Sequence, residues 1–205
     1  METVEHLEGK HHRGEIVTDD WSPWGDENIL GKPGERRADG STADDYGIAY
    51  RKDSRYTLGT VPMSSEDMAR IAKDRKYLVL PVYAYVHGGA TISLRPFAYP
   101  WDSGQSGIVY ASKAWMKKER IRKREEFLRG QVEDCRMYLE GECYGYRVFR
   151  DSDGELVSDC YGYMGLDYVR KECRSMLTHY DERHDIELAN EAERDTYNTA
   201  PSGAD

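Results

Sequence analysis

The segment YLVLPVYAYVH, residues 77–87, constrains the fold more than any other stretch of this 205-residue chain. It is aliphatic, β-branched and aromatic throughout, a composition typical of a β-strand. The residues GGA at 88–90 then predict a tight turn into a second strand, TISLRPF at 91–97, so the two strands form an antiparallel hairpin. Pro81 has no N–H to donate to a neighbouring strand, which predicts a sheet edge or a bulge at that point.

A second hairpin is predicted over residues 143–165, CYGYRVFRDSDGELVSDCYGYMG, with DSDG as its turn. Further strand material lies in residues 46–59 and in IVYAS at 108–112. A short helix is predicted to begin after Ser64 or Ser65, because acidic residues follow in its first turn. The central expectation is therefore an antiparallel sheet built from two hairpins.

Two amphipathic helices are predicted to pack on this sheet. The first covers residues 113–140, with Ser112 as its N-cap and Gly141 at its end. Its apolar residues recur at spacings of three, four and seven, which is typical of one helical stripe. These residues are Ala114, Ile121, Leu128, Val132, Cys135 and Leu139. The second helix covers residues 166–182, and together the elements predict a single α+β domain over residues 46–182.

Both ends of the chain are polar. Residues 1–45 are predicted to be a partly disordered N-terminal arm, and residues 183–205 an acidic C-terminal tail. Hydrophobic residues make up 39% of the chain and charged residues 33%, which favours a core of middling size between polar ends. No apolar run approaches the roughly 20 residues of a membrane helix, and no signal peptide is visible. These features predict a cytosolic protein with reduced cysteines and no membrane partner.

The stretch YPWDSGQSGIVYAS, residues 99–112, most resembles a reaction centre. The Gly-x-Ser-x-Gly pattern of a serine nucleophile elbow is not met, because Gly107 comes one position too early. The Asp-Ser-Gly triplet matches the short signature of aspartic proteases, but it occurs once and does not follow an apolar strand. A turn is the preferred interpretation, in which Asp102 caps backbone N–H groups, Ser103 belongs to the bend, and Gly104 and Gly107 take positive φ.

No metal site and no cofactor are predicted. The four cysteines lack the C-x-x-C spacing of a structural zinc site. They lie at positions 135, 143, 160 and 173. Cys135 and Cys173 fall on apolar helix faces and are predicted to be core residues. The segment DSDGE at 151–155 lacks the sixth-position glycine of a calcium loop. His6, His11 and His12 are expected to bind a metal only opportunistically in a flexible arm. His179 and His184, with Asp181 and Asp185, are expected to form a solvated polar helix end.

Charge is distributed unevenly along a chain whose net charge is −9. Residues 113–124, KAWMKKERIRKR, hold seven Lys or Arg and one Glu, whereas residues 181–205 hold eight Asp or Glu and two Arg. One face of the predicted helix would carry Lys113, Lys117, Arg120 and Arg124, flanked by Lys118 and Arg122. Such a face can neutralise phosphates of DNA or RNA, and the alternative is a solvated face paired with nearby Glu. The acidic counterpart, a solubilising tail or a partner-binding surface that mimics phosphates, comprises Glu187, Glu191, Glu193 and Asp195.

Several segments occur in a fixed order over about residues 46–165: RYTLG, LVLPVYAYVH, GATISLRPFAYPWDSGQSGIVYASK, YLEGECYGYRVF and DCYGYMG. Together they resemble a family of accessory proteins encoded by phages, prophages and plasmids that carries a PWDSGQxG motif. The GKPGERRADG loop and the acidic tail depart from that pattern. The resemblance implies a small accessory protein of a mobile element, made in the cytoplasm of a bacterial host, and it carries over no catalytic residues.

The function that follows is a non-enzymatic one. By analogy with small acidic phage proteins, we expect binding to a host protein or nucleoprotein complex, with an anti-CRISPR or anti-restriction role as the concrete example. One alternative is a nucleic-acid-binding accessory protein that uses the basic face at 113–124. A second alternative is a hydrolase centred on Asp102 and Ser103.

Overall fold

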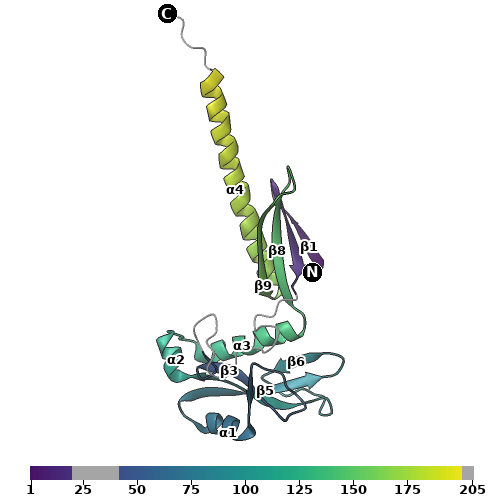
Figure 1. Ribbon diagram of the computed structural model, residues 1–205, viewed down its shortest axis with the longest axis vertical. Coiled ribbons are helices and arrows are strands. Elements are labelled where there is room, and N and C mark those ends of the chain that lie inside the picture. The colour runs from purple at the N-terminus through teal and green to yellow at the C-terminus, as the bar shows by residue number, and fades with distance from the viewer. Residues whose placement is uncertain (20–41, 200–205) are drawn as a thin grey trace, which may run out of the picture. The chain divides into compact units, whose positions relative to one another are not determined.

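A computed structural model describes residues 1–19 and 42–199, which have the predicted α+β fold (Figure 1). Contacts between residues divide the chain into two compact units. Residues 1–20 together with residues 143–205 form one of them, the terminal unit. Residues 21–142 form the other, the central unit.

The central unit is built on a five-stranded sheet of order β4-β3-β7-β5-β6. The β3–β4 pair is parallel, and every other neighbouring pair is antiparallel. The strands are β3 (Tyr46–Arg51), β4 (Val61–Met63), β5 (Tyr77–Val86), β6 (Ala90–Ser93) and β7 (Ser103–Ser112). The first predicted hairpin is confirmed as β5 and β6, with Gly88 at φ +70° in the turn.

Pro81 lies at a point of β5 where a neighbouring strand is paired on one side only, which suits a residue without an N–H. It pairs with Ile108 of β7 on one side, whereas the β6 ladder on the other side begins only at Tyr83. The register between β5 and β7 also shifts between Val82 and Tyr83. The prediction of a bulge is therefore confirmed next to Pro81, whereas the alternative of an edge strand is wrong, because β5 lies between β7 and β6.

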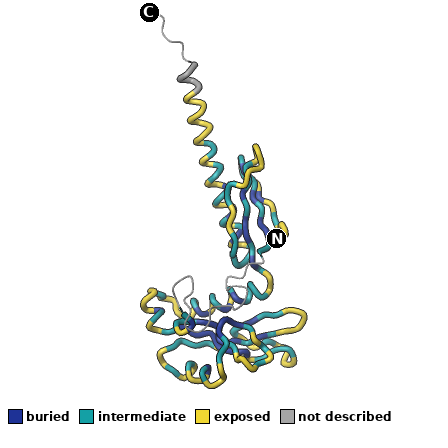
Figure 2. Tube along the Cα trace, viewed as in Figure 1, coloured by how far each residue is buried: buried dark blue, intermediate teal, exposed yellow. Residues whose placement is uncertain are grey.

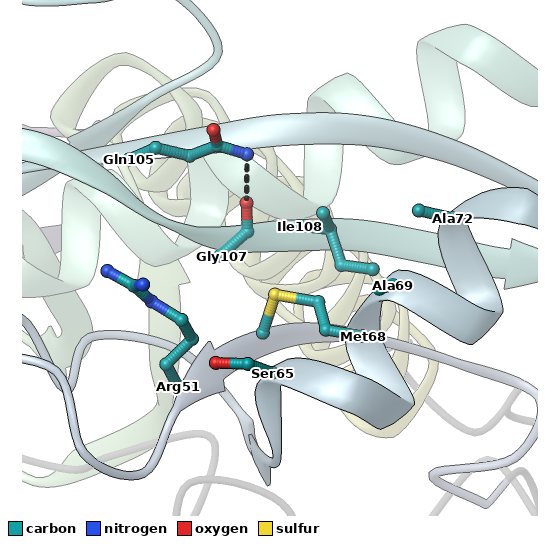
Figure 3. A pocket seen from close by; sticks show the side chains of 8 residues that line it. All are labelled: Arg51, Ser65, Met68, Ala69, Ala72, Gln105, Gly107 and Ile108. Carbon is teal, nitrogen blue, oxygen red and sulfur yellow. Dashed lines mark hydrogen bonds between the residues drawn. The ribbon is translucent and has the colours of Figure 1, made fainter.

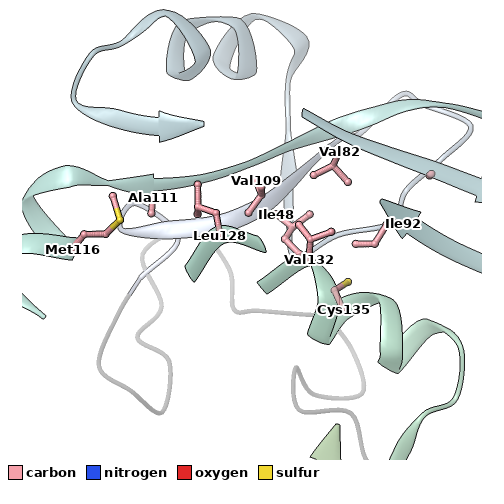
Figure 4. Packing of buried hydrophobic residues seen from close by; sticks show 10 residues of the cluster. Ile48, Val82, Ile92, Val109, Ala111, Met116, Leu128, Val132 and Cys135 are labelled. Atoms are coloured by element: carbon pink, nitrogen blue, oxygen red, sulfur yellow. The ribbon is translucent and has the colours of Figure 1, made fainter. Parts of the chain in front are cut away.

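Helices pack against both faces of the central sheet. They are α1 (Ser65–Lys73), α2 (Lys113–Lys118) and α3 (Arg124–Leu139). Consecutive residues of a strand point to opposite faces, so the side chains of Ile48 and Ala49 lie on the two different faces of the sheet. Ile48 packs in a cluster with Leu128 and Val132 of α3, as Figure 4 shows. Ala49 packs in a second cluster with Met68 of α1.

The helix predicted over residues 113–140 is in fact two helices, α2 and α3, with Arg120 between them at φ +57°. Met116 and Leu128 are both buried, and twelve residues separate them. At 100° per residue, one straight helix would direct these side chains about 120° apart. The break allows both to reach the core. Ala114, which was expected on the apolar stripe, is exposed, and Met116 takes its place.

The terminal unit is a four-stranded antiparallel sheet, of order β1-β2-β8-β9, with one long helix packed on it. Its elements are β1 (Thr3–Glu8), β2 (His12–Thr18), β8 (Cys143–Arg150), β9 (Leu156–Met164) and α4 (Leu166–Thr199). The second predicted hairpin is confirmed as β8 and β9. The expectation that both hairpins share one sheet is wrong, because β8 and β9 pair with β1 and β2 instead.

The polar arm predicted over residues 1–45 is likewise wrong for residues 3–18, which form β1 and β2. Ile16 of β2 is fully buried and pairs with Tyr146 of β8. The partner strand lies about 130 residues later in the chain, so no local sequence pattern indicates this pairing. For the same reason the single domain predicted over residues 46–182 is divided, since its last third completes the sheet that the first strands begin.

Helix α4 begins at Leu166, as predicted, and buries Val169, Cys173 and Leu177 against the sheet. Every residue from 186 to 194 is exposed, so this part of the helix is covered by neither sheet nor loop of the described chain (Figure 2). Ile186 is 62% exposed and Leu188 is 46% exposed. The acidic tail is therefore helical as far as Thr199, and residues 200–205 lie outside the described part.

Candidate functional site

The Asp-Ser-Gly stretch lies at the turn that leads into β7. Ser103 donates its hydroxyl to the carbonyl oxygen of Tyr99 at 2.6 Å, and Val86 N–H donates to Asp102 O at 3.0 Å. The carboxylate of Asp102 lies 3.6 Å from Arg55 Nη2 and 3.3 Å from His87 Nδ1. The bend is thus fixed by its own hydrogen bonds and by two cationic or ionisable neighbours.

The turn interpretation holds for Asp102, whereas Ser103 is already the first residue of β7, and two further details need correction. The recorded contacts of the Asp102 carboxylate are with Arg55 and His87, not with backbone N–H groups. Gly104 and Gly107 lie within β7 and do not have positive φ. A Cβ at position 107 would approach Ala49 O to 1.7 Å, so this glycine permits the close approach of β3 and β7.

This geometry does not assemble a hydrolytic centre. Serine catalysis requires a base within hydrogen-bond reach of the hydroxyl, and the Ser103 hydroxyl is instead directed at a backbone carbonyl. His87 contacts Asp102, and its side chain is 70% exposed. Among the described residues the Asp102 carboxylate contacts no second carboxylate, so the aspartic-protease arrangement is not formed either.

Exposed aromatic side chains gather next to this turn. Trp101 is 86% exposed and Tyr99 is 65% exposed. Behind them, the ring of Tyr85 lies 6.0 Å from that of Tyr99 and 5.7 Å from that of Phe97. Arg55 donates to Trp101 O at 3.1 Å. We call Arg55, Tyr85, Phe97, Tyr99 and Trp101 the Trp101 surface.

The Trp101 surface was not predicted from the sequence, because the neighbouring Asp-Ser-Gly triplet is the feature that resembles a known motif. The available signal was RPFAYPW, residues 95–101, which places three aromatic residues and two prolines in one connection between strands. A connection of that composition has more apolar surface than a turn needs.

A pocket of about 340 Å³ lies beside α1, between that helix and the start of β7 (Figure 3). Its lining consists of Arg51, Ser65, Met68, Ala69, Ala72, Gln105, Gly107 and Ile108. Arg51 is the one ionisable residue among these eight, and the amide of Gln105 donates to Gly107 O at 3.4 Å. Among the described lining residues the Ser65 hydroxyl has no carboxylate or imidazole beside it to act as a base, so this pocket offers no catalytic chemistry.

The predicted basic face is not one face of a helix. Lys113 and Lys117 lie on α2, Arg120 lies in the break, and Arg124 is the first residue of α3. These residues therefore surround a corner of the central unit.

The predicted acidic residues all lie on the exposed half of α4. Glu187 pairs with Arg183 at 3.3 Å, and Glu191 and Glu193 are exposed on the same helix. The side chain of Asp195 lies outside the described part of the structure.

His11, His12 and His184 lie in a polar cluster of the terminal unit, so the solvated position expected of His184 is wrong, whereas His6 and His179 are exposed. Asp181 accepts hydrogen bonds from the backbone N–H groups of Lys10 and His11, at 2.6 and 2.9 Å, and lies 2.8 Å from His12 Nδ1. Burial alone would raise the pKa of the Asp181 carboxyl, but these partners together hold it below its ordinary value. No group of three His, Cys, Asp or Glu in the described residues could hold a metal ion. The cluster instead attaches the β1–β2 turn to α4.

No family model, curated protein or solved structure matches the chain. Within residues 1–19 and 42–199, no helix has the length and apolar character needed to cross a membrane. The function is therefore argued from the surfaces themselves.

Proposed function

We propose that this chain is a non-enzymatic binding protein of a phage or another mobile element, and that it contacts a host protein through the Trp101 surface. The observation that carries the proposal is the 86% exposure of Trp101 beside the 65% exposure of Tyr99. Large aromatic side chains left in water are unfavourable for an isolated domain, and Trp, Tyr and Arg are the residues that dominate binding energy at protein interfaces.

The surroundings of Trp101 favour a protein partner over a small ligand. A small ligand needs a concave site, and two pockets of the described chain, of about 340 and 480 Å³, are lined by other residues, beside α1 and between β6 and α3. They also favour a protein over nucleic acid, because the carboxylate of Asp102 lies next to the Arg55 guanidinium. A balanced charge of this kind gives little attraction for phosphates.

The Trp101 surface is also held in place before any partner arrives. Ser103 fixes Tyr99, Arg55 holds the carbonyl of Trp101, and the Val86 N–H holds the carbonyl of Asp102. A loop that is ordered in advance loses less conformational entropy on binding. This support explains how a connection between strands could act as a stable contact surface.

The partner that best suits a mobile-element protein is a component of host immunity, such as a CRISPR or restriction complex. The resemblance of residues 46–165 to phage and plasmid accessory proteins supports this choice, and the analogy with counter-defence proteins supplies the role. In this proposal the protein blocks its target by occupying a contact surface in the bacterial cytoplasm.

A pull-down with the full-length chain tests the proposal. The bait is incubated with lysate from a host that carries CRISPR and restriction systems, and a partner retained in stoichiometric amount is purified. We expect Trp101→Ala to weaken the affinity for that purified partner at least about 30-fold, as removal of an interface anchor does.

The matched control is Tyr168→Ala, which removes another exposed aromatic side chain, on α4 of the terminal unit. Tyr168 is 54% exposed, so the control changes a comparable surface and should leave the affinity unchanged. The proposal is wrong if no stoichiometric partner is retained, or if Trp101→Ala and Tyr168→Ala bind alike while circular dichroism shows both folded.

A further inference from the structure

The positive charge around the break between α2 and α3 comes from that segment and from a second segment that folds against it. Lys113 N–H donates to Lys76 O at 2.8 Å, and Lys113 Nζ donates to Arg75 O at 2.7 Å. These bonds bring the turn before β5 against the start of α2. Two further cationic residues, Arg75 and Lys76, thereby join the predicted basic segment. Both are exposed.

Most cations of this corner have no acidic partner in the described chain. Lys118 and Lys123 form ion pairs with Glu119 and Glu126, at 3.5 and 2.9 Å. The described residues provide no ion pair for six others, which we call the basic corner: Arg75, Lys76, Lys117, Arg120, Arg122 and Arg124.

Pairing is the usual state of arginine elsewhere in the same unit. Arg70, Arg129 and Arg136 each contact a carboxylate within 3 Å. The six residues of the basic corner are therefore free to take an anionic ligand.

The backbone at Arg120 is strained. Among the described residues, Arg120 is the one non-glycine residue with positive φ, at +57°. This conformation is unfavourable for a side chain with a Cβ, and such strain persists where the surroundings or the function require it. Glycine would fit this position without strain, yet the chain has an exposed arginine there.

The acidic character of the whole chain does not extend to this unit. Its described residues, 42–142, contain 17 Lys or Arg and 14 Asp or Glu, a net charge of +3. The described residues of the terminal unit contain 9 Lys or Arg and 18 Asp or Glu, a net charge of −9. An overall charge of −9 is thus compatible with a local cationic surface.

We propose that the basic corner binds the sugar–phosphate backbone of duplex DNA without reading its sequence. Unpaired guanidinium and ammonium groups are the ligands that phosphates require. Binding of single strands would also need exposed aromatic rings for base stacking. The rings beside this corner, Trp115 and Phe127, are partly buried and pack on Tyr46 with centroids 4.6 and 5.4 Å away. The high charge density of the duplex is therefore the better match.

This inference is independent of the proposed protein contact. The basic corner adjoins the Tyr77–Ser112 end of the β5–β7 ladder, and the Trp101 surface adjoins its Tyr85–Ser103 end. The eight residue steps between them correspond to about 26 Å along the strands. Substitution of one surface therefore leaves the other intact.

Fluorescence anisotropy with a short labelled DNA duplex tests the inference on the full-length chain. If four phosphates are contacted, the affinity should fall roughly 100-fold between 50 and 200 mM salt. We expect the double variant Lys117→Glu/Arg122→Glu to bind at least about tenfold more weakly. We expect Arg120→Gly to reduce the salt slope by about one while raising the melting temperature, because glycine accepts this φ.

The control Lys52→Glu/Lys171→Glu alters two exposed lysines that do not belong to the basic corner and changes the net charge by the same amount. It should lose less than about threefold in affinity. Three results would overturn the inference: no binding of duplex at 50 mM salt, equal losses in the two double variants, or binding to anionic phospholipid vesicles without binding to duplex. The third also indicates that an anionic membrane surface is the ligand of the corner.

Discussion

The two units bury their sheets in different ways. In the central unit, helices pack on both faces, and the apolar clusters around Leu128 and around Met68 lie on opposite sides of the same strands. In the terminal unit, α4 alone supplies the helical layer, and its apolar contacts are supplemented by charged ones. Arg170 Nη2 of α4 lies 2.8 Å from Glu5 of β1, and Asp181 holds the β1–β2 turn. One unit is held by apolar packing, and the other relies in part on polar attachments at its rim.

The units also differ in how the sequence encodes them. All described elements of the central unit come from one continuous segment, residues 42–142, whereas the terminal unit joins residues 1–19 to residues 143–199. Folding therefore separates charge as well as structure, with +3 on the described residues of the central unit and −9 on those of the terminal unit. The net charge of the whole chain therefore conceals a central unit whose described residues carry the opposite sign. We therefore expect the two units to unfold independently of each other, which can be tested.

The largest effect is expected from Gly107→Ala in the central unit. The added methyl group would lie 1.7 Å from Ala49 O, so β3 and β7 must separate. We expect the free energy of unfolding of this unit to fall by at least about 3 kcal/mol. Of the three buried cysteines, Cys135 in α3 and Cys173 in α4 measure the two units separately. Burial raises the pKa of the Cys135 thiol to about 12 and that of Cys173 to about 11, so neither reacts until its unit opens.

The expected result is that thiol labelling of Cys135 accelerates about 100-fold or more in Gly107→Ala, while labelling of Cys173 is unchanged. Cys160, which is exposed, reacts at once and controls for reagent quality. Equal acceleration at Cys135 and Cys173 would show that the units unfold together, and the comparison would fail.

A smaller effect is expected from Asp181→Asn in the terminal unit. The substitution weakens the acceptor for two backbone N–H groups and for the buried His12 ring, which should cost about 2 kcal/mol at neutral pH. The pKa of Asp181 lies below its ordinary value of 3.8 in the folded unit. Its contribution is therefore complete above that value and is lost as the pH falls through the lowered pKa. Urea unfolding monitored by circular dichroism should show the difference at neutral pH and its disappearance in strongly acidic buffer.

The neighbouring variant Asp185→Asn serves as the control. Asp185 receives side-chain contacts from Lys10 and His11 but no backbone N–H group in the described structure, so a smaller loss is expected. Equal losses for the two variants would mean that the backbone contacts of Asp181 do not hold the turn.

Much of the fold could be predicted because the signals were local. The hairpin at β5–β6 follows from an apolar strand and a glycine turn, and the N-caps at Ser64 and Ser112 follow from residue type and spacing. Pairing of β2 with β8 could not be predicted, since nothing near Ile16 indicates a partner about 130 residues away. The break at Arg120 was not predicted, because apolar residues spaced by seven indicate one continuous stripe. The side chains of Met116 and Leu128 would nevertheless point in different directions from a single helix.

The candidate surfaces were predicted less well. The charges of residues 113–124 were visible in the sequence, but Arg75 and Lys76 join them only through hydrogen bonds across the fold. The exposure of Trp101 was not predicted, because exposure depends on tertiary structure. An aromatic residue in a connection between strands is buried beneath that connection as often as it is exposed. Local patterns report elements and charge runs, and the exposure of one side chain depends on everything around it.

The smallest effect is expected from Leu188→Ala on the exposed half of α4. Leu188 is 46% exposed and adjoins no buried cluster, and alanine favours the helix, so the change in unfolding free energy should stay within about 0.5 kcal/mol. Leu177→Ala on the packed half is the matched control, because Leu177 is buried and should cost about 2–4 kcal/mol. Urea unfolding monitored at Cys173 compares the two. A cost above about 1 kcal/mol for Leu188→Ala would mean that this half of α4 is covered in solution. If that cost rises with protein concentration, a second copy of the chain covers it, and if it does not, the covering surface belongs to the same chain. Either result would replace the contrast between a packed and a free half of α4 with a helix that is buried along its whole length.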